Sequence, residues 1–128
     1  MELQNNNVVI TGASMGIGEK MAEAFAAAGA NVLVVARSAD KLQQVAKRIG
    51  GHALTADLSG AQGVDGLVDR CVEVLGHIDV WVNNVGGSDE KTTRTLVDTP
   101  DEVFRSQLEL NLTSAFQGAK AAASNMPN

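Results

Sequence analysis

A glycine-rich turn near the start of the chain offers the clearest chemistry in the sequence. It reads Thr11-Gly12-Ala13-Ser14-Met15-Gly16-Ile17-Gly18, with an apolar segment before it and an alanine-rich segment after it. Gly12 allows a tight turn, Gly16 lets the main chain approach a pyrophosphate, and Gly18 lets a helix pack closely. Amides that open a helix at Ile17 carry the positive end of its dipole, so the turn is predicted to bind phosphate. A turn without a ligand is the alternative.

Polar residues elsewhere in the chain could act together with this turn. Arg37-Ser38, Asp57-Leu58 and Asn83-Asn84-Val85-Gly86 each follow an apolar segment. Two adjacent Asn residues at the end of a buried strand are costly unless their amides are hydrogen-bonded. Asn111 interrupts an apolar helical stretch, where Asn is a poor helix former and must find a partner. A surface position for Asn111 is the alternative.

The spacing of apolar residues predicts alternating strands and helices around these groups. Strands are predicted at 8–10, 31–36, 52–56 and 78–82. Helices are predicted from 17 to a stop at Gly29, over 40–49, over 64–75 and from 100 to about 125, with a polar loop over 87–99. Thr99 is expected to cap the last helix, with Pro100 at its first position.

Strands that alternate with helices predict an α/β fold with a parallel sheet covered on both faces. The expected strand order is 3-2-1-4, a doubly wound, Rossmann-type sheet that lacks its C-terminal strands. In this order the chain reverses direction between strands 1 and 4, where such sheets bind ligands. Residues 1–128 are therefore interpreted as a single, incomplete dinucleotide-binding domain.

Composition narrows the classes of partner. The net charge is −5 and there is no basic run, which argues against nucleic acid and against an anionic membrane surface. No apolar stretch approaches the ~20 residues of a membrane span and no signal-peptide pattern is present, so a cytoplasmic location is expected. The lone Cys71 and the separate His52 and His77 predict no metal site.

The glycine spacing resembles that of short-chain dehydrogenases/reductases, whose signature Thr-Gly-x-x-x-Gly-x-Gly is matched at every fixed position. The segment 83–86 is similar to the family's Asn-Asn-Ala-Gly motif, with Val85 in place of Ala. The resemblance implies that Asn83 and Asn84 join strand 4 to the Thr11 turn and that Gly86 admits the coenzyme. Asn111 resembles the family's Asn that distorts a helix and holds a water in a proton relay. The implied activity is hydride transfer between a nicotinamide coenzyme and a small carbonyl or alcohol substrate.

The end of the second strand predicts which coenzyme is bound. Enzymes specific for NAD place an acid here to bind the ribose 2′-hydroxyl, whereas this chain has Ala36-Arg37-Ser38. Arg37 can bind a 2′-phosphate, with Ser14 as a second contact, so we favour NADP over NAD; a solvated Arg37 is the alternative. Asp57 resembles the family's acid that bonds the adenine amino group, with Leu58 beside the ring. A helix cap is the alternative for Asp57.

The chain contains no tyrosine. In the family a Tyr is the general acid/base, a Lys four residues later lowers its pKa, and a Ser polarises the substrate, all beyond the helix that carries Asn111. We therefore expect the sequence to stop before the catalytic Ser and the Tyr-x-x-x-Lys motif, and this chain alone to be inactive. Phe116 and Lys120 have the Tyr–Lys spacing but lie on the wrong helix, so they are interpreted as a core and a solvent-exposed residue.

Two classes of function remain. The first is an NADP-dependent reductase or alcohol dehydrogenase, and the second is a non-catalytic module that senses or sequesters a dinucleotide. A methyltransferase is disfavoured by the missing acid after the second strand and by the Asn83 motif. The resemblance also implies a homo-oligomer, when full length, that associates through the Asn111 helix. Because an open strand edge and apolar helix faces would be exposed, we expect this chain to be marginally stable or to self-associate.

Overall fold

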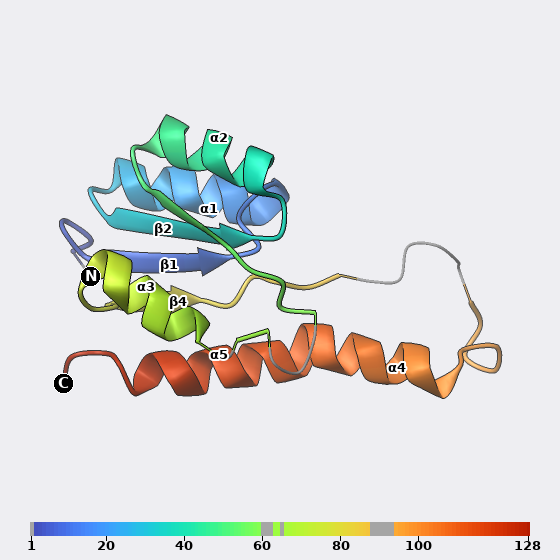
Figure 1. Cartoon of the computed structure of the whole chain (residues 1–128). Helices are drawn as coiled ribbons and strands as arrows, with labels where there is room; N and C mark the ends of the chain where they lie inside the picture. The colour runs from blue at the N-terminus through green and yellow to red at the C-terminus, as the bar shows by residue number, and fades with distance from the viewer. Residues whose placement is uncertain (1, 60–62, 65, 88–93) are drawn as a thin grey trace.

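The computed structural model describes residues 2–59, 63–64, 66–87 and 94–128. Strands and helices alternate along the chain as predicted (Figure 1). The elements are β1 Asn7–Thr11, α1 Gly16–Ala27, β2 Asn31–Ala36, α2 Ala39–Ile49, β3 His52–Thr55, α3 Leu67–Leu75, β4 Val80–Val82, α4 Asp101–Leu108 and α5 Ser114–Ala123. A π-helical segment, η1 Glu109–Thr113, joins α4 to α5. Six residues of the predicted polar loop, 88–93, and Gly60 lie outside the described ranges.

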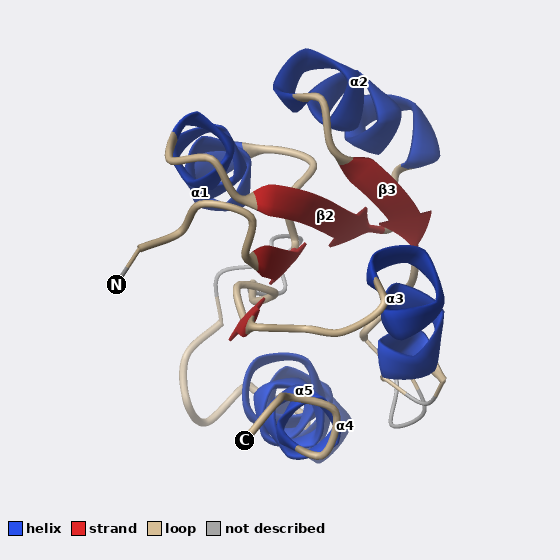
Figure 2. Cartoon of the chain, turned by 90° about the vertical axis from the view of Figure 1, so that its left-hand side faces the viewer, coloured by secondary structure: helices blue, strands red, loops and turns tan. Residues whose placement is uncertain are grey.

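The sheet is parallel and has the strand order β3-β2-β1-β4, which confirms the predicted doubly wound topology. β1 is central, with Val9 opposite Leu33 of β2 on one side and Trp81 of β4 on the other. Helices α1 and α2 cover one face, and α3 with the α4–α5 helix covers the other (Figure 2). Strands β2 and β3 lie on one side of β1, whereas β4 lies on the other side. The side to which strands are added therefore changes between β1 and β4, next to the glycine-rich turn.

Side chains of the central strands alternate between two apolar cores. Val8 and Ile10 of β1 pack in the core under α1 and α2, whereas Val9 packs in the core under α3. In β2, Val32 and Val34 belong to the first core and Leu33 and Val35 to the second. None of these residues is more than 1% exposed. Burial on both faces is typical of parallel strands and explains why the sequence shows continuous apolar runs.

The starts of two elements differ from the prediction by more than one residue. Helix α3 begins at Leu67 rather than near 64, because Gly66 before it has φ +71° and Val64 is buried in the preceding turn. Strand β4 begins at Val80, two residues later than expected. The carboxylate of Asp79 accepts a hydrogen bond from the amide of Asn7 (2.7 Å) at the start of β1. This side chain therefore holds the residue before β4 next to the first residue of β1.

The start of α4 also differs from the prediction. Thr99 does not cap the helix, because its hydroxyl donates to the carbonyl of Thr95 (2.8 Å) in the preceding turn. Pro100 occupies the cap position instead of the first helical position. Its carbonyl accepts hydrogen bonds from the amides of Val103 and Phe104 (3.0 and 3.2 Å).

The interpretation of Phe116 as a core residue is wrong. Phe116 is 65% exposed, and Phe104, Leu108 and Leu112, at four-residue intervals before it, are 40–63% exposed. The helix meets the rest of the described chain through its other side, where Gly118 and Ala122 are buried. An apolar stripe, defined as Phe104, Leu108, Leu112 and Phe116, therefore faces outward.

Candidate functional site

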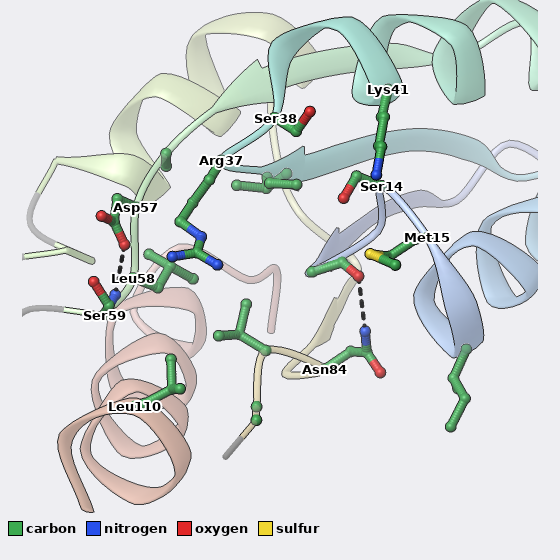
Figure 3. A pocket seen from close by; sticks show the side chains of 18 residues that line it. Ser14, Met15, Arg37, Ser38, Lys41, Asp57, Leu58, Ser59, Asn84 and Leu110 are labelled. Carbon is green, nitrogen blue, oxygen red and sulfur yellow. Dashed lines mark hydrogen bonds between the residues drawn. The ribbon is translucent and has the colours of Figure 1, made fainter. Parts of the chain in front are cut away.

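A cavity of about 1070 Å³ opens at the carboxyl ends of β1, β2 and β4 (Figure 3). The predicted topology assigns a ligand to this position. The cavity is lined by Gly12, Ser14, Met15, Ile17, Val35, Ala36, Arg37, Ser38, Lys41, Ala56, Asp57, Leu58, Ser59, Asn84, Val85, Gly86, Gly87 and Leu110. All the site residues predicted from the sequence are in this lining except Gly16, Gly18, Asn83 and Asn111.

The glycine-rich turn forms one wall of the cavity. Gly12 and Gly16 have φ values of +68° and +61°, a conformation that L side chains rarely adopt. A Cβ built on Gly18 would lie 2.5 Å from Nδ2 of Asn84 and even closer to the carbonyl oxygen of Gly12. The first turn of α1 therefore packs directly against the turn, which explains why Gly18 is needed although it does not line the cavity.

Hydrogen bonds from Thr11 and Asn84 join the ends of β1 and β4 beside the cavity. The buried hydroxyl of Thr11 donates to the carbonyl of Val82 (3.2 Å) and accepts from the amides of Asn84 and Val85 (3.1 and 3.4 Å). Nδ2 of Asn84 donates to the carbonyl of Gly12 (3.1 Å). The predicted connection between strand 4 and the Thr11 turn is therefore confirmed for Asn84.

Asn83 has a different role from the predicted one. Its Oδ1 accepts a hydrogen bond from Nε1 of Trp81 (2.8 Å), and a Cβ built on Gly118 of α5 would lie 2.5 Å from the same oxygen. Neighbouring side chains in an extended segment point in opposite directions, so only one Asn of the pair can reach the Thr11 turn. The prediction that both amides join the strands is wrong for Asn83, which packs against α5.

Cationic and hydroxyl side chains follow β2 along the cavity. The side chain of Arg37 extends into the cavity above Leu58, and Lys41 points from α2 toward the turn that carries Ser14 (Figure 3). Ser38 is the N-cap residue of α2, yet its hydroxyl makes no capping hydrogen bond. This part of the wall therefore presents hydrogen-bond donors of the kind that bind phosphate groups.

Asp57 lies on the wall opposite the glycine-rich turn, next to the buried Leu58. Its Oδ1 accepts a hydrogen bond from the amide of Ser59 (2.9 Å). Hydrogen bonds from the hydroxyl and the amide of Ser59 hold the pKa of Asp57 below its usual value, and the charge of Arg37 lowers this pKa further. Among the described helices, the next one along the chain is α3, which begins only at Leu67, so Asp57 does not cap it.

Asn111 lies in η1, behind the cavity wall formed by Gly86 and Gly87. Its Oδ1 accepts from the amide of Gly87 (2.9 Å), while its Nδ2 donates to the carbonyls of Gly87 (2.9 Å) and Gln107 (3.0 Å). A Cβ built on Gly86 would come within 3.0 Å of Oδ1 of Asn111. The side chain thus holds the loop after β4 against the helix, and the helix is distorted at this residue.

These hydrogen bonds predict the effect of replacing Asn111 with a shorter residue. We expect Asn111→Ala to lower the free energy of unfolding by about 1–2 kcal/mol and to speed hydrogen exchange of the Gly87 amide, which loses its acceptor. Asn125→Ala is the matched control, because Asn125 follows the end of α5 and its Nδ2, among the described residues, donates to the nearby carbonyl of Ala121 (3.0 Å). Unchanged exchange at Gly87 in the Asn111 variant would contradict the assignment.

Several lining residues were not predicted as site residues, among them Met15, Lys41, Ser59 and Leu110. Lys41 carries a recognisable signal, because it is a cation four residues after Arg37 at the start of a predicted helix. Leu110 gives no such signal, since an apolar residue on an apolar helix face predicts packing. Within the described part of the chain, no helix is both long and apolar enough for a membrane span, and no three His, Cys, Asp or Glu side chains form a metal-binding group.

Comparison with known proteins identifies a family model and curated relatives that match this chain. The model of the short chain dehydrogenase family matches residues 6–128. The 7alpha-hydroxysteroid dehydrogenase of Escherichia coli K12 is 35% identical in an alignment 131 positions long, which covers 98% of this chain and 50% of that protein. The chain thus spans about half the length of such curated relatives.

Solved structures of short-chain dehydrogenases are also similar to this chain. A short-chain type dehydrogenase/reductase from Mycobacterium marinum is 40% identical and has a TM-score of 0.85, over 97% of this chain and 51% of that one. A short chain dehydrogenase from Burkholderia cenocepacia, solved in complex with NADP, is 30% identical with a TM-score of 0.88. That match covers all of this chain and 54% of the other.

Proposed function

Because the chain belongs to the short-chain dehydrogenase family, we propose that it binds NADP(H) in the cavity at the ends of β1, β2 and β4. The proposed reaction is hydride transfer between this coenzyme and a small carbonyl or alcohol substrate. The observation that carries the proposal is the joint placement of the glycine-rich turn and Arg37 on one cavity. Its volume of about 1070 Å³ lies just above the about 300–1,000 Å³ usual for small-molecule sites, as an extended dinucleotide requires.

Each part of the coenzyme has a proposed partner. The diphosphate binds the main-chain amides of the turn that ends at Ile17, where the dipole of α1 favours an anion. The adenine lies beside Leu58 with its amino group donating to Asp57. The nicotinamide end lies toward Val85 and Gly86, where a larger residue than Gly would crowd Asn111.

Arg37 supports NADP rather than NAD. No acid occupies the positions 36–38 where a carboxylate would bind a free ribose 2′-hydroxyl and repel a phosphate. The Arg37 guanidinium can instead donate two parallel hydrogen bonds to a 2′-phosphate. Ser14 and Ser38 offer hydroxyl groups on the same cavity wall.

Calorimetric titration of the chain with NADPH and NADH at one ionic strength tests the proposal. We expect NADPH to bind with a dissociation constant at least about tenfold lower than that of NADH, the value of one charge-assisted hydrogen bond. Equal binding of the two would contradict the choice of NADP. Absence of heat with either coenzyme, for a chain shown to be folded by circular dichroism, would contradict the coenzyme site itself.

The second candidate is a dinucleotide-binding module without turnover. It is favoured by the absence of tyrosine from the 128 residues, because the family resemblance assigns proton transfer to a Tyr. Because this chain alone is expected to be inactive, the test uses the native gene product, loaded with NADPH and mixed with a panel of aldehydes and ketones. Loss of NADPH absorbance supports the oxidoreductase, whereas tight binding with no loss supports the module.

We place the protein in the cytoplasm and propose that it self-associates when full length. The outward-facing apolar stripe of α4 and α5 supports association, because contiguous exposed apolar surface is uncommon on monomers.

A further inference from the structure

Lys41 is a cation on the cavity wall that the proposed function does not yet use. It is the third residue of α2, is exposed at the surface, and lines the same cavity as Arg37 and Ser14. Among the described residues it forms no salt bridge with a carboxylate, whereas Lys20 and Arg48 pair with glutamates of α1. No carboxylate in the described part of the chain therefore neutralises the charge of Lys41.

The two cations of this wall reach into the cavity from different directions. Arg37 extends over Leu58, on the side of Asp57, where its charge contributes to the lowered pKa of that carboxyl. Lys41 points toward the turn that carries Ser14 (Figure 3). Between them lies Ser38, whose hydroxyl is not used to cap α2. The space between Arg37 and Lys41 is thus bordered by two cations and by hydroxyl donors.

This donor set fits a phosphate monoester. Such a group carries close to two negative charges at neutral pH and three acceptor oxygens, so one cation leaves it only partly neutralised. The diphosphate has its own partners in the amides of the glycine-rich turn. The other phosphate group of the coenzyme is the one on the adenosine ribose, and this is the group that the side chains after β2 can bind.

We propose that Lys41 is a specificity-determining residue that binds the 2′-phosphate of the coenzyme together with Arg37. The inference rests on the proposed function, since it assumes that the cavity holds an adenine dinucleotide. Lys41 supplies a compact charge from the side of Ser14, and Arg37 supplies its planar guanidinium from the side of Asp57. Preference for NADP then depends on two cations rather than on Arg37 alone.

The test compares two ligands of equal charge, adenosine 2′,5′-bisphosphate and adenosine 3′,5′-bisphosphate, by calorimetry. We expect the unmodified chain to prefer the 2′ isomer and Lys41→Gln to reduce that preference about tenfold, the worth of one charge-assisted hydrogen bond. Lys41→Arg should retain most of it. Lys47→Gln, in the last turn of the same helix, is the control for loss of one positive charge and should change nothing.

The outcomes separate the inference from the function on which it rests. If the unmodified chain binds neither bisphosphate, the proposed function fails and the inference with it. If it prefers the 2′ isomer and Lys41→Gln keeps that preference, only the inference is overturned. The same holds if Lys41→Gln weakens both isomers equally, because a general electrostatic effect does not distinguish ligands of equal charge. Circular dichroism confirms that each variant is folded.

Discussion

Replacement of Gly18 by Ala is expected to destabilise the chain by about 2–3 kcal/mol and to abolish NADPH binding. The added Cβ would meet the carbonyl oxygen of Gly12, Nδ2 of Asn84 and, at 2.9 Å, Cα of Ala13. Two of these atoms are main chain, so the contact is not relieved by a side-chain rotation. Relief requires α1 to move away from the turn, which breaks the bond from Asn84 to Gly12 and displaces the amides proposed to hold the diphosphate.

The measurement is chemical denaturation followed by NADPH titration of the folded fraction. Gly87→Ala is the matched control, because its Cβ would make only an ordinary contact, 3.7 Å from Cδ2 of Leu110. A Gly18 variant as stable as the Gly87 variant would show that the helix does not pack on the turn as described.

Reversal of the charge at Arg37 is expected to have the largest effect on coenzyme choice. Arg37→Asp removes the proposed guanidinium contact, places a carboxylate where a 2′-phosphate would lie, and supplies an acceptor for a free 2′-hydroxyl. NADPH affinity should fall by about 100-fold, as expected for loss of a charged hydrogen bond plus repulsion, while NADH affinity rises.

The control for this reversal is Arg105→Asp, which makes the same change of charge on the exposed side of α4. Both variants are titrated with NADPH and NADH at two salt concentrations. If Arg37→Asp and Arg105→Asp weaken NADPH equally, Arg37 acts only through net charge and the proposed 2′-phosphate contact is incorrect.

The sheet and the cavity could be predicted from the sequence because two strong patterns specify them. The apolar runs 8–10 and 31–36 require burial on both faces, and the confirmed order β3-β2-β1-β4 follows from strands that alternate with helices. The Gly12 turn ends β1 and the Asn84 segment ends β4, so this order alone brings them together.

The features that the sequence could not predict depend on the direction in which a side chain points. Asn83 and Asn84 are identical in type, and only the alternation of an extended backbone decides that Asn84 reaches Gly12 while Asn83 reaches Trp81. The apolar spacing that includes Phe116 predicts a buried face but not what covers it, and this residue is exposed. Lys41 enters the cavity only because α2 begins at Ala39 and turns its third residue toward Ser14.

In the proposed complex a dinucleotide lies along the cavity, from Asp57 and the start of α2, past the glycine-rich turn, to Val85 and Gly86. Amide chemical shifts of the isotopically labelled chain, recorded with and without NADPH, test this most directly. We predict that the largest shifts occur at 12–18, 37–41, 57–59 and 84–87, with little change along the apolar stripe. Shifts that cluster on that stripe, or that leave the glycine-rich turn unchanged at saturating NADPH, would contradict it.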